Sequence, residues 1–250
     1  MRFKDKVAIV TGGGRDIGKS ISLRLASEGA KVVINYRSDE AAAKATLDEI
    51  EAAGGTALLA RADVTKADEV AALVKATTEA FGGKVDILVN CAGGMVARKT
   101  LADMDAAFFD TVMDLNLKSA FLVTKAVLPH LESGAAIVNI ASQAGRDGGG
   151  PGASIYAASK GALMTLTRSW AKELGPQGIR VNALNPGLIG TSFHDIFSKP
   201  EGRAAVAGNT PLRREGHPDE VAAAVAFLAS GDASFLTGTN VDINGGLFFS

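Results

Sequence analysis

The stretch VAIVTGGGRDIG (residues 7–18) joins an apolar run to a glycine-rich turn. A short apolar run bounded by turn residues is typical of a buried strand. Gly12, Gly13 and Gly14 permit main-chain angles and close approaches that side chains forbid. A helix beginning near Ile17 would direct unpaired N–H groups and its positive dipole end at the turn. The stretch therefore favours a phosphate-binding strand–turn–helix unit. A purely structural turn is the alternative, because the glycine spacing departs from G-x-G-x-x-G.

The same alternation continues along the chain. Apolar, β-branched runs occupy residues 7–10, 31–35, 56–60, 86–90, 136–141, 179–184 and 239–243. Between them lie stretches with helical composition, among them residues 40–53, 67–81, 106–131, 156–174 and 219–229. Continuous apolar runs indicate strands covered on both faces, and strand–helix alternation indicates a parallel sheet. We predict one α/β domain over residues 1–250: a doubly wound parallel sheet of about seven strands with helices on both faces. Residues 189–211, rich in Gly, Ser, Pro and Asn, are predicted to leave the sheet as a substrate loop.

Composition and charge narrow the classes of function. The 250 residues are 47% hydrophobic and 21% charged, which suits a large core. A net charge of -1 gives no electrostatic reason to expect nucleic acid or an anionic membrane as partner. One cysteine suits a reducing compartment, and neither a signal peptide nor an apolar segment of about 18 residues is evident. His130, His194 and His217 are dispersed, so no metal site is expected. These features predict a cytoplasmic protein.

A second group of residues indicates acid–base chemistry. In SIYAASKGAL (residues 154–163), Tyr156 and Lys160 are four apart and share one face of a helix. A phenol titrates near pH ~10, and a neighbouring ammonium is expected to lower its pKa. Ser142 ends the run AIVNIAS (residues 136–142) and so lies at the carboxyl edge of the sheet, where open α/β folds bind ligands.

Together these segments resemble the short-chain dehydrogenase/reductase family almost from end to end. TGGGRDIG (residues 11–18) resembles its cofactor turn T-G-x-x-x-G-x-G, ADV (62–64) its adenine segment and NCAG (90–93) its N-x-A-G. Asn116 matches the catalytic asparagine, Ser142 the serine, YAASK (156–160) the Tyr-x-x-x-Lys pair and NPG (185–187) the segment beside the nicotinamide.

The resemblance implies a Rossmann-type fold, an NAD(P) cofactor and hydride transfer to or from a carbonyl carbon. Tyr156 would exchange the proton, Ser142 would stabilise the oxygen, Lys160 would hold the nicotinamide ribose, and Asn116 would position a water that carries protons. Besides Tyr156 and Lys160, the implied cofactor contacts are Gly12, Gly14, Arg15, Asp16, Ile17, Gly18, Arg37, Ser38, Asp63, Val64, Asn90, Ala92, Gly93, Pro186, Gly187, Ile189 and Thr191.

The end of the second predicted strand favours NADP, with NAD as the alternative. Tyr36 stands where NAD-preferring members carry an acidic residue, and Arg37 and Ser38 follow. Arg15 adds a second guanidinium suited to a 2'-phosphate. Asp39 is predicted to cap the helix that begins at the next residue.

The sequence limits the class of substrate only in part. Members that reduce 3-oxoacyl groups on acyl carrier protein resemble one another in basic residues before the Ser142 strand and before GIRVN (residues 178–182). Here these places hold Glu132 and Gln177. A small carbonyl or alcohol is therefore expected, with 3-oxoacyl-[acyl-carrier-protein] reductase as the alternative. A non-catalytic nucleotide-binding sensor is a third reading, disfavoured because a sensor has no use for Tyr156. The resemblance also implies a homotetramer that pairs residues 106–131 and 156–174, and the apolar end GGLFFS (245–250) is expected to contact another subunit or the substrate loop.

Asp16 is the one departure inside a core motif, because it replaces the middle glycine of the family's turn. A carboxylate about 5 Å from a pyrophosphate would be repelled by about 3 kcal/mol at an effective dielectric near 20. We predict that the side chain turns back to cap the first turn of the following helix, with Arg15 offsetting its charge.

Overall fold

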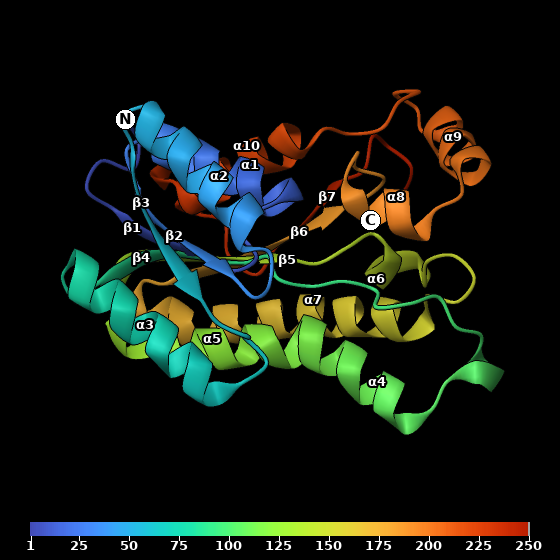
Figure 1. Cartoon of the computed structure of the whole chain (residues 1–250), viewed down its shortest axis with the longest axis horizontal. Helices are drawn as coiled ribbons and strands as arrows, with labels where there is room; N and C mark the ends of the chain where they lie inside the picture. Colours follow the sequence, from blue (N-terminus) through green and yellow to red (C-terminus); the bar gives the residue numbers. More distant parts are fainter. Residues whose placement is uncertain (250) are drawn as a thin grey trace.

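A computed structural model, which describes residues 1–249, contains one sheet of seven parallel strands in the order β3-β2-β1-β4-β5-β6-β7 (Figure 1). The strands are β1 (Val7–Val10), β2 (Lys31–Tyr36), β3 (Thr56–Arg61), β4 (Val85–Asn90), β5 (Leu131–Ile140), β6 (Arg180–Pro186) and β7 (Asn240–Ile243). The chain proceeds outward from β1 to β3, returns to pair β4 with β1, and proceeds outward again to β7. The predicted doubly wound α/β sheet is confirmed.

The helices follow the predicted segments closely, with one interruption. They are α1 (Asp16–Ser27), α2 (Glu40–Ala52), α3 (Ala67–Phe81), α4 (Ala106–Met113), α5 (Ser119–Val127), α6 (Ala144–Asp147), α7 (Ser154–Leu174), α8 (Ser192–Phe197), α9 (Pro200–Asn209) and α10 (Pro218–Ala229). The segment predicted as one helix over 106–131 is divided by a π-helical turn, η2 (Asp114–Lys118), and ends in a 3-10 turn, η3 (Leu128–His130), that includes a proline. Among residues 1–249, no helix is both long and apolar enough to cross a bilayer.

Two hydrophobic cores lie on opposite faces of the sheet. Neighbouring strand residues point to opposite faces, so Val10 packs with Leu25 of α1 and Val225 of α10. Ile9 belongs to the other core, with Leu73 of α3 and the apolar sides of α5 and α7. Figure 1 shows the resulting layers: α1, α2 and α10 cover one face, and α3, α4, α5 and α7 cover the other. Coverage of both faces explains why the strands read as unbroken apolar runs.

All seven strands end at the same edge, because every pair is parallel. The order of the strands reverses between β1 and β4, and in such sheets ligands bind in the crevice outside the carboxyl ends at that point. Residues 189–211, predicted to leave the sheet as a substrate loop, contain no strand of the sheet and carry the two short helices α8 and α9. In Figure 1 these helices stand beyond the ends of the strands, close to the C-terminus.

Candidate active site

The glycine-rich turn after β1 is built by close main-chain packing. Gly12 has φ +64°, in the left-handed region that favours glycine. A Cβ on Gly18 would lie 2.0 Å from the Gly12 carbonyl oxygen, so no larger residue fits where α1 passes over the turn. A Cβ on Gly14 would lie 2.8 Å from the Cα of Ala43 in α2. These glycines bring α1 and α2 onto the turn, and the turn becomes a fixed feature of the sheet edge.

Asn35 supports the turn from below, and the sequence analysis missed it. This side chain is 2% exposed and accepts a hydrogen bond from the Gly12 N–H at 3.2 Å. Its amide nitrogen donates to the carbonyl oxygens of Ala60 at 3.2 Å and Ala62 at 3.1 Å. The signal available in the sequence was a polar residue at the end of the apolar run KVVIN. Asn35 thereby joins the turn after β1 to the segment after β3.

Asp16 does not cap α1, so that prediction is wrong. The N-cap is Arg15, and among the described residues no side chain caps this helix. The Asp16 carboxylate instead accepts hydrogen bonds from Ser192 in α8, from its N–H at 2.9 Å and its hydroxyl at 2.6 Å. The reason is the backbone conformation: Asp16 has φ 50°, in the left-handed region, rather than the extended angles of an N-cap. Arg15 lies near its charge, with 3.9 Å between Nε and Oδ2.

The start of α1 fits an anionic group. The first N–H groups of a helix have no partner within the helix, and side chains usually cap them. Here no cap bond is present within residues 1–249, and the helix spans twelve residues, long enough for its dipole to favour an anion. Gly14, Arg15, Ile17 and Gly18 therefore offer main-chain donors at the crevice, as expected for a pyrophosphate site.

Ser142, Tyr156 and Lys160 converge beside the end of β5. The Lys160 side chain is 3% exposed, and its Nζ donates to the Ile140 carbonyl oxygen at 2.8 Å. Its Nζ lies 5.9 Å from the centre of the Tyr156 ring. Burial lowers the pKa of Lys160 from its ordinary 10.5 to about 8. The predicted grouping of these side chains, just after β5 and on α7, is thus present in the structure.

The Tyr156 phenol behaves differently from the prediction. Burial raises its pKa above the ordinary value, and a hydrogen bond with the Ser142 hydroxyl opposes this increase only in part. We expected a net decrease caused by Lys160; the sign is opposite because loss of hydration is the largest effect. At neutral pH the phenol therefore keeps its proton, which is the form needed to donate a hydrogen ion.

Asn116 lies in the π-helical turn between α4 and α5 and holds the loop after β4. Its amide nitrogen donates to the carbonyl oxygens of Gly94 at 2.8 Å and Val112 at 2.9 Å, and its oxygen accepts from the Gly94 N–H at 2.9 Å. A Cβ on Gly93 would lie 2.8 Å from Asn116 Oδ1 and 3.0 Å from Lys160 Nζ. The loop is thus packed directly between Asn116 and Lys160. Such π turns occur frequently at functional sites.

The ends of β1 and β4 are joined by buried polar groups. The Thr11 hydroxyl accepts from the N–H groups of Cys91 at 2.9 Å and Ala92 at 3.0 Å. Asn90 is 4% exposed, and its amide donates to Thr124 and Asn139. The Asn90 side chain therefore faces the core, and its implied contact with the cofactor stays a prediction. Burial raises the pKa of the Cys91 thiol to about 12, as suits a neutral, unreactive thiol.

The ends of β2 and β3 present cations. Arg15, Arg37 and Ser38 are exposed, and Arg61, which the sequence analysis missed, donates from Nε to the Arg37 carbonyl oxygen at 3.2 Å. The sequence feature that could have indicated Arg61 is an arginine at the end of the apolar run TALLAR.

The acidic groups near these cations are engaged within their own segments. Asp39 caps α2 by accepting from the Ala42 N–H at 3.1 Å, which confirms its predicted role. Asp63 accepts from the Thr65 N–H and hydroxyl, which lowers the pKa of its carboxyl although burial acts against this. Its neighbour Val64 is 5% exposed.

The end of β6 forms the opposite side of the crevice. Pro186 ends the strand, and Gly187 follows so closely that a Cβ there would lie 2.7 Å from that of Asn244. Ile189 is buried, and the Thr191 hydroxyl donates to its carbonyl oxygen at 3.2 Å. These residues of the NPG segment and its continuation lead directly into α8.

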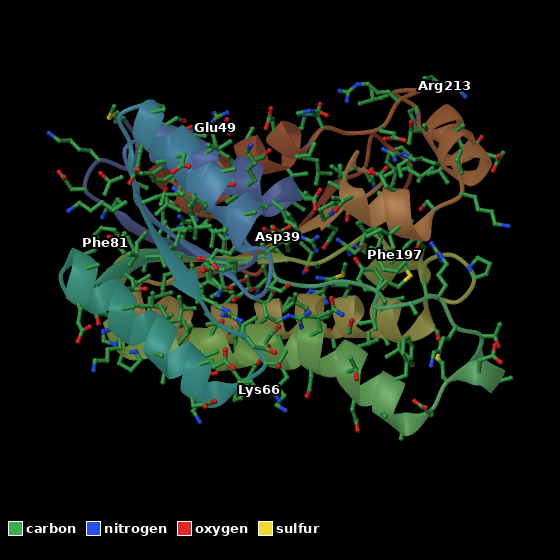
Figure 2. All side chains as sticks on the ribbon, in the orientation of Figure 1. Asp39, Glu49, Lys66, Phe81, Phe197 and Arg213 are labelled. Carbon is green, nitrogen blue, oxygen red and sulfur yellow. The ribbon has the colours of Figure 1, made fainter. Side chains whose placement is uncertain are left out.

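Two residues that the sequence analysis missed connect α8 to the acid–base group. The Phe193 ring lies 5.8 Å from the Tyr156 ring, centre to centre, at an interplanar angle of 37°. Arg98, in the loop after β4, donates to the Phe197 carbonyl oxygen and to that of Pro151, both at 2.8 Å. In Figure 2, Phe197 lies at the end of α8 that faces α6. Neither contact has a signal in the sequence, because each joins segments that are distant in the chain.

Comparisons with known proteins agree with this geometry. A family model described as enoyl-(acyl carrier protein) reductase matches residues 12–248. A 3-oxoacyl-[acyl-carrier-protein] reductase of Synechocystis sp. is 41% identical over 247 residues, which covers 97% of this chain and 96% of that protein. These two descriptions name different acyl substrates, so they do not identify the substrate of this chain.

Two solved structures share the whole fold. A short chain dehydrogenase from Burkholderia cenocepacia, in complex with NADP, has a TM-score of 0.93 at 35% identity and covers 99% of both chains. An NADH-dependent reductase responsible for alginate metabolism has a TM-score of 0.90 at 36% identity, again over 99% of both chains. The chain described here therefore belongs to the short-chain dehydrogenase/reductase family, whose members are NAD(P)-dependent enzymes acting on carbonyl or CH–OH groups.

Proposed function

We propose that this enzyme transfers hydride between NADP(H) and the carbonyl or secondary alcohol group of a small substrate. The observation that carries the proposal is the convergence of Ser142, Tyr156 and Lys160 at the carboxyl edge of the sheet, beside an uncapped helix start. A protonated phenol and a hydroxyl beside a phosphate-binding turn suit reduction of a carbonyl. Neither group is needed to bind a nucleotide alone.

Each of these residues has a separate role in the reduction of a carbonyl. Bound NADPH supplies the hydride. Tyr156 holds a proton on its phenol oxygen and gives it to the carbonyl oxygen of the substrate, since its raised pKa keeps it protonated at neutral pH. Ser142 donates a hydrogen bond to the same oxygen and stabilises the negative charge that develops there. The positive charge of Lys160, 5.9 Å from the centre of the Tyr156 ring, favours the phenolate that remains after the proton has been given.

The described residues fit the cofactor. The main chain of residues 14–18 would receive the pyrophosphate, and Lys160 would hold the nicotinamide ribose, because only one of its three donors has a partner among residues 1–249, the Ile140 carbonyl. Asp63 and Val64 would meet the adenine, and Ala92, Gly93, Gly187 and Thr191 would line the crevice between the two ends of the cofactor.

The charges after β2 and β3 support NADP over NAD. Arg15, Arg37 and Arg61 provide guanidinium groups, whereas Asp39 and Asp63 are engaged with their own segments. A guanidinium grips a phosphate with two hydrogen bonds, and a ribose diol would instead require an acceptor.

Replacement of the phenol tests the proposal. Tyr156→Phe is expected to reduce kcat with NADPH across a panel of small ketones by about 10²-fold or more, with the Kd for NADPH unchanged. The chain's other tyrosine offers a matched control: Tyr36→Phe removes a hydroxyl at the end of β2, away from Ser142, and should keep kcat. Turnover by Tyr156→Phe at the native rate would reject this mechanism. A native protein that binds NADPH but reduces no carbonyl would favour the nucleotide sensor.

The surface at the start of β5 and β6 favours a small substrate over a carrier-bound one. The two places that are basic in carrier-dependent relatives lie side by side, because the Gly134 N–H donates to the Gly178 carbonyl oxygen at 2.9 Å. They present Glu132, whose side chain is 67% exposed, and Gln177. Lys84 lies near but pairs with Glu132 at 3.0 Å and Asp86 at 3.4 Å. This surface offers little positive charge to an acidic carrier.

The second candidate function is that of a 3-oxoacyl-[acyl-carrier-protein] reductase, because the 41% identical relative from Synechocystis sp. is such an enzyme. We expect kcat/KM for a 3-oxoacyl carrier protein to be no higher than for the same acyl group on a short thioester mimic. A large preference for the carrier-bound form would establish the second candidate instead.

We further propose a homotetramer. Phe109 in α4 and Phe121 in α5 are 45% and 44% exposed, and Phe121 borders a shallow apolar groove with Met113, Leu117 and Leu166 of α7. Burial of this face between copies would remove these aromatic rings from water. Light scattering of native protein and of Phe121→Glu tests it, since the substitution should lower the oligomer mass.

A further inference from the structure

Asp16 connects two parts of the site that no other described side-chain hydrogen bond joins: the glycine-rich turn and α8. Its two bonds to Ser192, at 2.9 and 2.6 Å, have an ionised acceptor, and such bonds are shorter and stronger than neutral ones. Its side chain is 28% exposed, so water screens the contact only in part. Aspartate also tolerates the left-handed backbone at this position better than most residues.

The segment that Asp16 holds has little packing of its own. None of the residues of α8 or α9 is fully buried. Ion pairs of Arg203 with Asp195 and Glu215 join the segment to itself and to the residues that follow. The polar bonds that connect α8 to the rest of the site are those of Asp16 at its start and of Arg98 at its end. The position of α8 therefore depends on few contacts, and removal of one should be measurable.

The position of Ser192 determines that of the next residue. Phe193 follows Ser192 directly and packs on the Tyr156 ring at 5.8 Å, and on Phe197 at 5.0 Å. A loop that moved away at Ser192 would carry Phe193 off Tyr156 and expose the phenol to water. Asp16 thus acts on the proton donor through α8, without touching it.

We propose that Asp16 is a positioning residue of the substrate loop: its carboxylate holds Ser192 so that Phe193 covers Tyr156 before cofactor or substrate binds. The consequence for catalysis rests on the proposed function, whereas the effect on the loop does not. The same contact gives this carboxylate two hydrogen-bond donors from outside the glycine-rich turn. The acidic residue in the phosphate-binding turn therefore has a structural role, which is to hold Ser192 at the start of α8.

Limited proteolysis of the cofactor-free enzyme tests the contact directly. Chymotrypsin cleaves after Phe193 and Phe197, and cleavage of a loop follows the fraction of time that it is open. We expect initial cleavage within residues 192–199 to be roughly tenfold faster in Asp16→Gly, because charge-assisted bonds are lost. Ser192→Ala, which keeps its main-chain N–H, should be cleaved faster by a smaller factor. The double variant should not exceed Asp16→Gly, since the contact is already absent.

Asp39→Asn is the matched control, because within residues 1–249 this carboxylate bonds only its own helix α2, and its loss should leave cleavage at the native rate. Thermal unfolding followed by circular dichroism shows that each variant is folded. Cleavage of Asp16→Gly at the native rate would overturn the proposal, as would full additivity of Asp16→Gly and Ser192→Ala.

Steady-state kinetics extend the test to catalysis. Asp16→Gly should raise the KM for the carbonyl substrate several-fold and lower kcat less, because Ser142, Tyr156 and Lys160 are unchanged. Asp16→Asn retains an acceptor for the Ser192 N–H and should restore much of the loss. If Asp16→Gly only tightens NADPH binding, with unchanged cleavage and substrate KM, Asp16 acts on the cofactor and the proposal fails. If no carbonyl is reduced, the cleavage rates still decide the role of Asp16.

Discussion

Replacing Lys160 with methionine is expected to stabilise the cofactor-free enzyme at pH 7 while abolishing its activity. Lys160 is 3% exposed, and burial lowers its pKa from 10.5 to about 8. At about 1.4 kcal/mol per pKa unit, this difference corresponds to roughly 3 kcal/mol. Below pH 8 the buried charge therefore destabilises the folded state by about this amount. Methionine removes the charge but leaves the Ile140 carbonyl oxygen without its donor, a loss of about 1–2 kcal/mol. At pH 7 the free energy of unfolding of Lys160→Met should therefore be about 1–2 kcal/mol higher than that of the native enzyme.

The pH dependence isolates the charge from the change of shape. Because the folded pKa lies below that of the unfolded chain, the unfolded state alone holds the proton on Lys160 between pH 8 and 10.5. The destabilisation caused by the buried charge of Lys160 therefore decreases as pH rises through this range. Urea unfolding of both proteins, at equal concentration and at several pH values from 7 to 10, measures the difference. The advantage of Lys160→Met should be constant up to pH 8 and disappear by about pH 10.

Lys172→Met controls for the loss of one positive charge, because Lys172 is an exposed lysine on the same helix. The reasoning is refuted if Lys160→Met is no more stable than the native enzyme at pH 7. It is also refuted if the difference between them stays constant from pH 7 to 10.

Three further outcomes are expected. Arg37→Ala should raise the KM for NADPH by about tenfold or more and leave that for NADH nearly unchanged, since only NADPH carries the 2'-phosphate; equal effects on both cofactors would contradict the NADP assignment. Gly93→Ala should lower kcat by about a hundredfold, because the added Cβ would lie 2.8 Å from Asn116 Oδ1 and 3.0 Å from Lys160 Nζ; native kcat would show that the loop adjusts freely. Oxidation of the alcohol should accelerate as pH rises above neutrality, because this direction needs the base form of Tyr156, whose pKa burial raises. Initial rates in both directions from pH 6 to 10 measure this, and an oxidation rate that falls with increasing pH would contradict it.

The fold could be predicted from local patterns. The seven apolar runs correspond to the seven strands because a strand covered on both faces must be apolar at almost every position. The helix starts at Glu40 and Ala67 were correct, and Asp39 caps α2 as its residue type and position indicate. Ser142, Tyr156 and Lys160 were found because each lies at a strand end or on one helix face, relations that sequence spacing encodes.

Asp16 shows where sequence patterns reach their limit. Aspartate before a helix predicts an N-cap, yet Asp16 has a left-handed backbone conformation and its carboxylate accepts hydrogen bonds from Ser192 instead. Its partner, Ser192, is 176 residues away in the chain. No local rule relates the two positions.

The sequence by itself determined which segments form the seven strands, because strand formation depends on periodicity within single elements. It also predicted the phosphate-binding turn and the acid–base residues from spacing within single elements. The tertiary structure alone decided the sign of the Tyr156 pKa shift, since hydration depends on everything that surrounds the ring. It also decided the placement of Asn35 beneath the turn, of Arg61 beside Arg37 and of Phe193 on Tyr156. Each of these contacts joins segments that meet only after the sheet has assembled.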